Sequence, residues 1–148
     1  MIWAASFLAM TLPACQVLKG AEIQQVVGAA VTIDASQSGP GEDSGSDFCA
    51  WKRPDGRFVI LGVHRKESAA AARAAYEAQL VEAFGGGPAA QTITGVGDEA
   101  QYRNYVGGLK GGVAVVRVGL VVFTLEGPME RAAVLGLSNL VVARVGSH

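Results

Sequence analysis

The hydrophobic residues of this chain follow two spacings, one typical of helices and one typical of strands. In three stretches they recur three and four residues apart, which predicts amphipathic helices over residues 17–27, 69–84 and 129–145. Gly28 suits the left-handed position that ends the first helix, and Ser68 is a good N-cap for the second. Pro128 suits the first turn of the third helix.

A β-hairpin is the clearest strand signal. Residues 48–53 and 57–66 are two apolar-containing runs on either side of the turn sequence Pro54-Asp55-Gly56. Alternation along the first arm places Cys49 and Trp51 on one face, which we expect to face the core. The second arm is apolar on both faces, as expected for a strand inside a covered sheet.

The remaining segments complete an α+β pattern. Residues 31–33 predict a brief strand, residues 36–47 a mobile loop, and residues 91–127 three to four antiparallel strands. The order is then α-β-β-β-α-β-β-β-α, without the βαβ alternation of a parallel nucleotide-binding sheet. We predict a single α+β domain over residues 15–148, with a central antiparallel sheet of about six to seven strands and helices packed on its faces.

Residues 1–14 form an apolar segment without a charged side chain. The segment ends in small residues just before Cys15 and resembles the hydrophobic region of a signal peptide, although it lacks the basic residues that usually precede that region. A membrane-spanning helix needs about 20 apolar residues, more than this segment has. We therefore expect export to the periplasm, the cell surface or the extracellular space; the alternative is a segment packed against the domain.

The two cysteines, Cys15 and Cys49, have competing interpretations. Export favours a disulfide, which would stabilise the fold by about 3 to 4 kcal/mol in the chain-entropy model. Alternatively, the sequence Leu-Pro-Ala-Cys at positions 12–15 is a lipobox and Cys15 carries a lipid, which would leave Cys49 unpaired. These two fates exclude each other, and both stay open at this point. A metal site is disfavoured because no nearby Cys or His supplies further ligands.

The charge of the chain indicates which partners to expect. A formal net charge of -1 and a pI near 6.1 provide no long-range positive field to attract nucleic acid or an anionic membrane surface. No nucleic-acid partner is expected, and membrane contact is expected only through a lipid on Cys15. With 50% hydrophobic and 17% charged residues, the chain has enough apolar material to bury a core.

Motifs for cofactor or metal binding are weak. The glycine cluster at 107–112 leads into a strand, whereas a phosphate loop leads into a helix. The acidic residues Glu42, Asp43 and Asp47 lack the spacing of a calcium-binding loop. We therefore expect no metal and no cofactor.

Catalytic residue sets are equally sparse. The histidines are His64, at the end of a strand, and His148, at the end of the sequence. We expect a protein that is not an enzyme. The alternative is a small hydrolase or transferase in which His64 acts with a carboxylate such as Asp98 or Glu99.

Basic residues gather in the sequence around the hairpin, namely Lys52, Arg53, Arg57, Arg65 and Lys66. They predict one local positive patch on an otherwise neutral chain. The candidate partner-binding residues are Arg53, Arg57 and Arg65, together with Trp51 provided that it is exposed. The competing interpretation is a solvated hairpin whose charges keep the sheet edge from pairing with another molecule.

Several segments together resemble a group of uncharacterised bacterial secreted or lipoprotein domains common in actinobacteria. The segments are CQVLKGAEIQQVVG, FCAWKRPDGRFVILGV, TGVGDEAQY and GGVAVVRVGLVVFTLEG, followed by a closing helix. The resemblance implies a PsbP-like or Mog-type α/β sandwich, a class used mostly to bind proteins or small ligands, and a disulfide between Cys15 and Cys49. It implies no catalytic residues. The helix-capping Thr of that group is replaced by Lys19 before Glu22, so we expect the capping box to be lost, at a cost of about 1 kcal/mol.

Together these observations favour a non-catalytic, exported binding or accessory domain of the bacterial envelope. Its partner is expected to be a protein or a small ligand. A structural subunit of an envelope complex is a further alternative to the hydrolase or transferase, and a large exposed apolar patch would indicate it.

Overall fold

The computed structural model describes residues 12–85 and 89–146, which form four helices and one antiparallel sheet of eight strands. The helices are α2 (Ala14–Val17), α3 (Gly20–Val27), α4 (Ala69–Phe84) and α5 (Arg131–Val145), with a short 3₁₀ turn at Ala35–Gln37. The strands are β1 (Thr32–Ile33), β2 (Gly39–Pro40), β3 (Ser46–Lys52), β4 (Phe58–Arg65), β5 (Gln91–Ile93), β6 (Glu99–Asn104), β7 (Gly112–Val118) and β8 (Val121–Gly127). The α+β class and the antiparallel sheet are confirmed.

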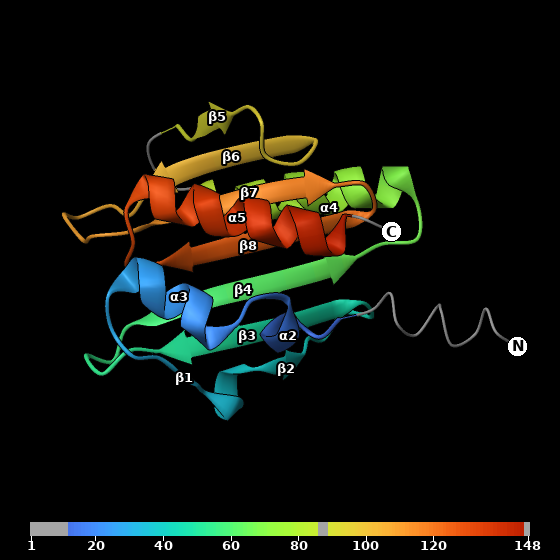
Figure 1. Ribbon diagram of the computed structural model, residues 1–148. Helices are drawn as coiled ribbons and strands as arrows, with labels where there is room; N and C mark the ends of the chain where they lie inside the picture. Colours follow the sequence, from blue (N-terminus) through green and yellow to red (C-terminus); the bar gives the residue numbers. More distant parts are fainter. Residues whose placement is uncertain (1–11, 86–88, 147–148) are drawn as a thin grey trace, which may run out of the picture.

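The sheet runs in the order β1-β3-β4-β8-β7-β6-β5, and β2 pairs with β3 beside β1. Helices α2, α3 and α5 cover one face, and α4 lies alone on the other, over β7 and β8 (Figure 1). The sheet has more strands than predicted because the loop before β3 contributes the two-residue strand β2. Among the described residues, no helix covers the β3 and β4 half of the face on which α4 lies.

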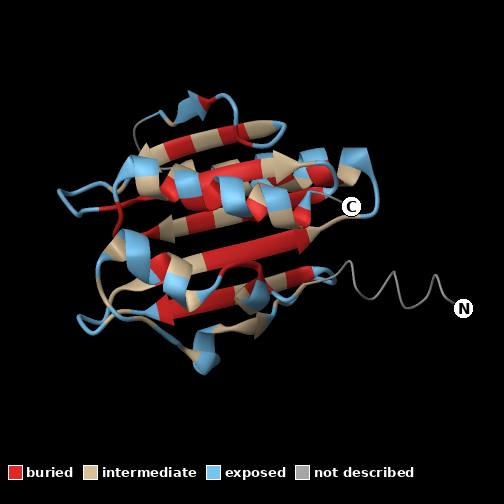
Figure 2. Cartoon of the chain, viewed as in Figure 1, coloured by how far each residue is buried: buried red, intermediate tan, exposed pale blue. Residues whose placement is uncertain are grey.

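The main core lies between the sheet and the layer of α2, α3 and α5. Buried residues concentrate along the central strands (Figure 2), and the largest fully buried side chains include Trp51, Tyr102 and Phe123. A smaller cluster under α4 joins Tyr76 to Val115 and Val122. Strand alternation explains the two clusters, because successive residues point to opposite faces of the sheet.

The predicted hairpin and the predicted middle helix are confirmed. Strands β3 and β4 pair around the 54–56 turn, where Gly56 has a φ of 88° and its N–H donates to the Arg53 carbonyl at 3.0 Å. Ser68 caps α4, its side chain accepting the Ala71 N–H at 3.1 Å. The hairpin turn and the helix cap both depend on residue types at neighbouring positions, so they can be predicted from the sequence.

The first predicted helix is divided in two. Leu18 is extended and fully buried, so the chain leaves the helix after Val17 and begins α3 at Gly20. Gly28 ends α3 with a φ of 69°, as predicted. The expected loss of the whole capping box is wrong, because the Glu22 carboxylate still accepts the Lys19 N–H at 2.8 Å.

The last helix begins at Arg131, so Pro128 is not in its first turn as predicted. Met129 is 2% exposed, and its N–H donates to the Gly127 carbonyl at 2.9 Å. Burying this side chain in the core keeps residues 128–130 outside the helix, and Glu130 becomes the N-cap.

The disulfide between Cys15 and Cys49 is present and ties α2 to β3. Two hydrogen bonds hold the preceding residues to the same hairpin: the Ala14 N–H donates to Asp47, and the Arg65 guanidinium donates to the Leu12 carbonyl at 2.6 Å. The predicted leader segment, residues 1–14, lies outside the described residues except for positions 12–14. In the part of the chain that the structure describes, no helix is long and apolar enough to cross a membrane.

Replacing Glu22 should make the free energy of unfolding depend less on pH in the acidic range. Hydrogen bonds from Arg144 lower the pKa of Glu22 from 4.5 to about 2, so its stabilising effect is full above pH 4.5 and is lost as the pH falls through about 2. We expect Glu22→Gln to cost about 1 kcal/mol at pH 6, because the pair is partly exposed, and progressively less towards pH 2. Urea unfolding at pH 6 and at pH 2.5 measures this difference; an equal cost at both would contradict it.

Candidate functional site

The predicted arginines do not share one surface. Arg53 and Arg57 flank the hairpin turn, where the Arg53 N–H donates to the Arg57 carbonyl at 2.8 Å, whereas Arg65 is the last residue of β4. A strand advances about 3.3 Å per residue, so Arg57 and Arg65 lie about 26 Å apart. The single positive patch expected from the sequence is therefore not formed, because an extended strand carries these residues to opposite ends of the hairpin.

The three guanidinium groups are also bonded within the chain. Their partners are the Asp55 carboxylate for Arg53 (3.0 Å), the Lys110 carbonyl for Arg57 (2.8 Å) and the Leu12 carbonyl for Arg65 (2.6 Å). Trp51 was a candidate contact residue only if its side chain proved to be exposed. It is 1% exposed and packs in the main core. Trp51 therefore acts in folding and is not a contact residue.

His64 does not lie near Asp98 or Glu99. The register places His64 opposite Val122 on β8, Val122 opposite Arg117 on β7, and Arg117 opposite Glu99 on β6. Neighbouring strands are about 4.8 Å apart, so His64 and Glu99 are separated by about 14 Å. The two acidic side chains instead bind Arg117, at 3.6 Å for Asp98 and 2.7 Å for Glu99. The alternative in which His64 acts with Asp98 or Glu99 is therefore wrong for these two carboxylates.

The partner of His64 is Ser46, directly opposite on β3. The Ser46 Oγ and the His64 Nδ1 are 2.8 Å apart, and the two residues are 7% and 9% exposed. Burial lowers the pKa of His64, with a further lowering from Lys66 that Glu82 and Asp43 oppose. The imidazole is therefore neutral near pH 7.

Gly62 on β4 leaves space for the ring of Phe48, which lies beside Ser46 and His64. Phe48 lies next to Ser46 on the same face of β3, and its ring meets His64 edge-on, with 5.6 Å between ring centroids. A Cβ added at Gly62 would lie 2.8 Å from the Phe48 ring, and one added at Gly41 would lie 2.6 Å from it. The ring thus occupies space that side chains at both positions would fill, as aromatic side chains often do over strand glycines.

A cavity of about 490 Å³ opens beside His64 and Ser46. Its walls come from the loop after β2, from β3 and β4, and from the last turns of α4. The lining residues are Pro40, Gly41, Glu42, Asp43, Ser46, Phe48, His64, Gln79 and Glu82. We call this space the His64 cavity.

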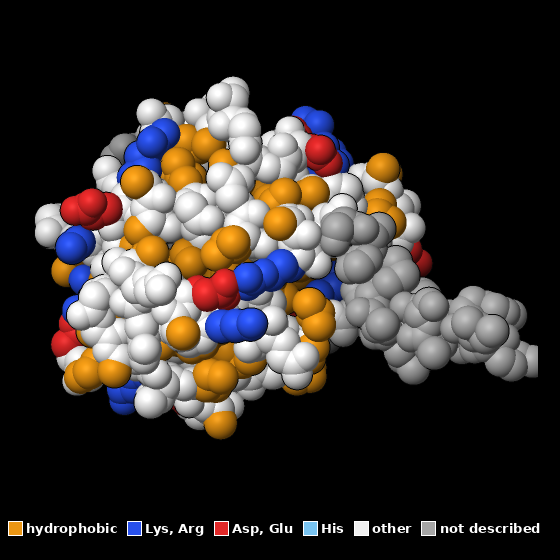
Figure 3. Space-filling view, in the orientation of Figure 1, with side chains coloured by type: hydrophobic (Ala, Val, Ile, Leu, Met, Phe, Trp, Pro, Cys, Tyr) orange, Lys and Arg blue, Asp and Glu red, His pale blue; other side chains and the backbone are white. Residues whose placement is uncertain are grey.

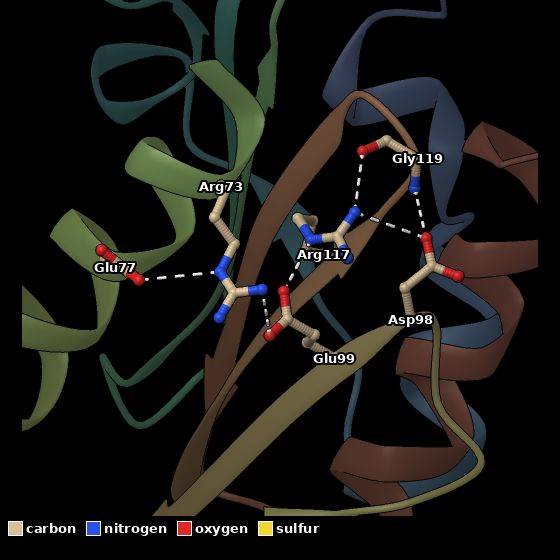
Figure 4. Close-up of polar contacts among 6 residues, drawn as sticks. All are labelled: Arg73, Glu77, Asp98, Glu99, Arg117 and Gly119. Atoms are coloured by element: carbon tan, nitrogen blue, oxygen red, sulfur yellow. Dashed lines mark hydrogen bonds and ion pairs between the residues drawn. The ribbon is translucent and has the colours of Figure 1, made fainter. Parts of the chain in front are cut away.

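A second cavity, of about 610 Å³, lies between α4 and the β5–β6 segment. Charged residues at its rim form a network across α4, β6 and β7 (Figure 4), with the ion pairs Arg73–Glu77, Arg73–Glu99, Arg117–Asp98 and Arg117–Glu99. Asp98 also accepts the Gly119 N–H at 2.7 Å and so caps the β7–β8 turn. Every carboxylate of this network has an arginine partner. The network is therefore explained by its contribution to the stability of the fold, without a ligand.

Sequence reasoning missed Ser46, Gln79 and Glu82. The first could have been found, because pairing Lys52 with Phe58 across the hairpin turn also brings Ser46 opposite His64. The other two lie on α4, and only the packing of that helix over the sheet brings them to the cavity.

Comparison with protein-family models and with curated protein sequences finds no match to this chain. Among the described residues, no group of three or more His, Cys, Asp and Glu side chains is placed to hold a metal ion.

Proposed function

We propose that this protein is an exported, non-catalytic binding domain of the bacterial envelope, and that the His64 cavity is its ligand site. The observation that carries the proposal is a concave space beside the Ser46–His64 pair, lined by the carboxylates of Glu42, Asp43 and Glu82, which have no ion-pair or hydrogen-bond partner among the described residues. Ligand sites typically combine such a concavity with a few polar groups that orient the ligand.

Export is supported by the disulfide between Cys15 and Cys49, since disulfides persist mainly in oxidising compartments. The resemblance to uncharacterised secreted domains with a PsbP-like or Mog-type sandwich points the same way. In the disulfide-bonded form the Cys15 sulfur has no valence left for a lipid. We therefore propose a location in the periplasm, at the cell surface or outside the cell, without a lipid anchor on Cys15.

A hydrolase or transferase is the second candidate, favoured by one observation. The Ser46 hydroxyl and the His64 Nδ1 are hydrogen-bonded at 2.8 Å, which is the first requirement for activating a serine nucleophile. Among the described residues no carboxylate is hydrogen-bonded to His64 to orient its ring, and the hydroxyl is largely buried. This geometry supports binding over catalysis.

Hydrolysis of an activated ester distinguishes a non-catalytic binding domain from a hydrolase or transferase. We expect p-nitrophenyl acetate to be hydrolysed at the same rate by the wild-type protein and by Ser46→Ala, because Ser46 serves as a hydrogen-bond partner and not as a nucleophile. His64→Gln is the matched variant for the base. A wild-type rate more than about ten-fold above both variants would overturn the non-catalytic function and establish the Ser46–His64 pair as catalytic.

An obligate structural subunit is less well supported. The large exposed hydrophobic residues of the described chain are spread over six elements and loops, with Val106 and Leu109 in one loop; they are Val26, Ile33, Val81, Val106, Leu109, Leu120 and Leu140. On the face formed by α2, α3 and α5, hydrophobic side chains show in small groups among polar and backbone atoms (Figure 3). An obligate interface is expected to be larger and more continuous.

A further inference from the structure

Among the described residues, α4 covers only the β7 and β8 half of its side of the sheet (Figure 1). The other half carries Phe48, Phe58 and Ile60, which are partly exposed and which alternation places on the same side as His64. Two neighbouring strands make a strip about 10 Å wide, the diameter of one helix. We call these three residues, together with Ala50 between them, the open strip.

Helix α4 is apolar on its outer side as well as on its inner side. The inner side carries the buried residues Ala72 and Tyr76. Ala74, Ala78 and Val81 recur four and three residues apart on the opposite side, and all three are exposed. Val81 is 72% exposed, more than any other large hydrophobic residue in the described part of the chain. A helix that is apolar on two sides normally lies between two layers, and one copy of the chain supplies only one.

The open strip and α4 run side by side, and hydrogen bonds fix the direction of the helix. Arg73, near the start of α4, pairs with Glu99, which the sheet register places in the same row as His64. The last carbonyl of α4 accepts from Arg103, which lies in the same row as Ile60. The start of α4 therefore lies at the His64 end of the open strip, and its last turn lies at the Ile60 end.

Charges of opposite sign lie at the two ends of the open strip. Glu42 and Asp43 lie at the His64 end, and neither side chain has an ion-pair or hydrogen-bond partner among the described residues. Lys52 lies at the other end, with its Nζ 5.9 Å from the centroid of the Phe58 ring, and forms no ion pair with a described carboxylate. The open strip is therefore negative at one end and positive at the other.

The charges of α4 follow the reverse order along the same direction. A helix carries a partial positive charge at its N-terminus and a partial negative charge at its C-terminus. Lys66 and Glu67 cancel at the first end, whereas Glu82, near the second, has no ion-pair or hydrogen-bond partner among the described residues. A second α4 laid on the open strip in this direction would place its positive end beside the two strip carboxylates and its Glu82 beside Lys52.

We infer that this side of the protein binds a second copy of the chain, with α4 of each copy lying on the open strip of the other. A two-fold axis parallel to the strands, between α4 and the open strip, produces this exchange and keeps the direction of both helices. The layers are then sheet, two helices side by side, and sheet. Phe48 belongs both to the open strip and to the wall of the His64 cavity, so the second copy would complete that wall.

The size of the contact sets its expected strength. The outer side of α4, a helix of 16 residues, measures about 24 Å by 10 Å, and the open strip measures about 20 Å by 10 Å. Together they make roughly half of the ~800 Å² per partner that a standard stable interface buries. We therefore expect a reversible dimer with a Kd on the order of 10 to 100 μM.

Sedimentation velocity of the disulfide-bonded protein, from about 1 to about 500 μM, measures this association. Val81→Glu should raise the Kd at least about ten-fold, because it sets a charge against the apolar strip of the other copy. Val26→Glu adds the same charge at an exposed position of α3, on the other side of the sheet, and should change the Kd less than about two-fold. Circular dichroism confirms that each variant is folded.

Charge reversal tests the contact between Lys52 of one copy and Glu82 of the other. Lys52→Glu and Glu82→Lys should each raise the Kd at least about five-fold, since each brings like charges together twice in the dimer. An equimolar mixture of these two variants should associate about as strongly as the wild-type protein, because both contacts of the mixed dimer then join opposite charges. Glu130→Lys, at the start of α5 on the other side of the sheet, should change the Kd less than about two-fold.

A protein that stays monomeric at about 500 μM would overturn the inference and leave the proposed function standing, because ester hydrolysis tests that function separately. Two further results would contradict the arrangement of the dimer. One is an equal effect of Val81→Glu and Val26→Glu on the Kd. The other is a mixture of the Lys52→Glu and Glu82→Lys variants that associates no more strongly than either variant alone.

Discussion

Replacing both cysteines, in the variant Cys15→Ala/Cys49→Ala, is expected to lower the free energy of unfolding by about 3 to 4 kcal/mol. The disulfide closes a loop with a sequence separation of 34 residues, and removing it restores conformational freedom to the unfolded chain. It also frees α2 from β3. For a domain of this size the loss corresponds to a fall in Tm of about 10 °C, which differential scanning calorimetry measures directly.

Reduction of the wild-type protein provides the control for this variant. Dithiothreitol should lower the wild-type Tm by a similar amount and leave the double variant unchanged. The stabilising role of the disulfide would be contradicted if the reduced and oxidised wild-type proteins unfolded at the same temperature.

Trp51→Ala is expected to cost about 3 to 5 kcal/mol, because the substitution leaves a cavity beneath α2, α3 and α5. Lys52→Ala, at the next and exposed position of β3, should change the stability by less than about 0.5 kcal/mol. Urea unfolding of the two variants measures the contrast. Equal stability of Trp51→Ala and the wild-type protein would instead support the contact role that the sequence suggested for this residue.

Features with local causes could be predicted from the sequence. The hairpin at 54–56 follows from a proline, an acid and a glycine in turn order, and α4 follows from an alanine-rich segment behind Ser68. Alternation along β3 correctly placed Cys49 and Trp51 in the core.

Features set by tertiary packing could not be predicted. Burial of Leu18 interrupts the first helix, and burial of Met129 delays the last one, against patterns that locally favour continuous helix. Strand β2 forms because β3 supplies hydrogen-bond partners to a segment without strand periodicity.

The candidate site shows the same division. The Ser46–His64 contact follows from the hairpin register and was within reach of sequence analysis. The carboxylates of the His64 cavity come from a loop and from α4, which are 39 positions apart between Asp43 and Glu82. Their convergence depends on how α4 crosses the sheet, and the sequence carries no local signal for that angle.

The intact mass of the protein purified from the envelope of its native host tests the central claim, an exported domain closed by the Cys15–Cys49 disulfide. We predict a chain shortened at its N-terminus, without a lipid adduct, and lighter by two hydrogens than its reduced form. A full-length chain with two free thiols, or a diacylglyceryl adduct on Cys15, would contradict it.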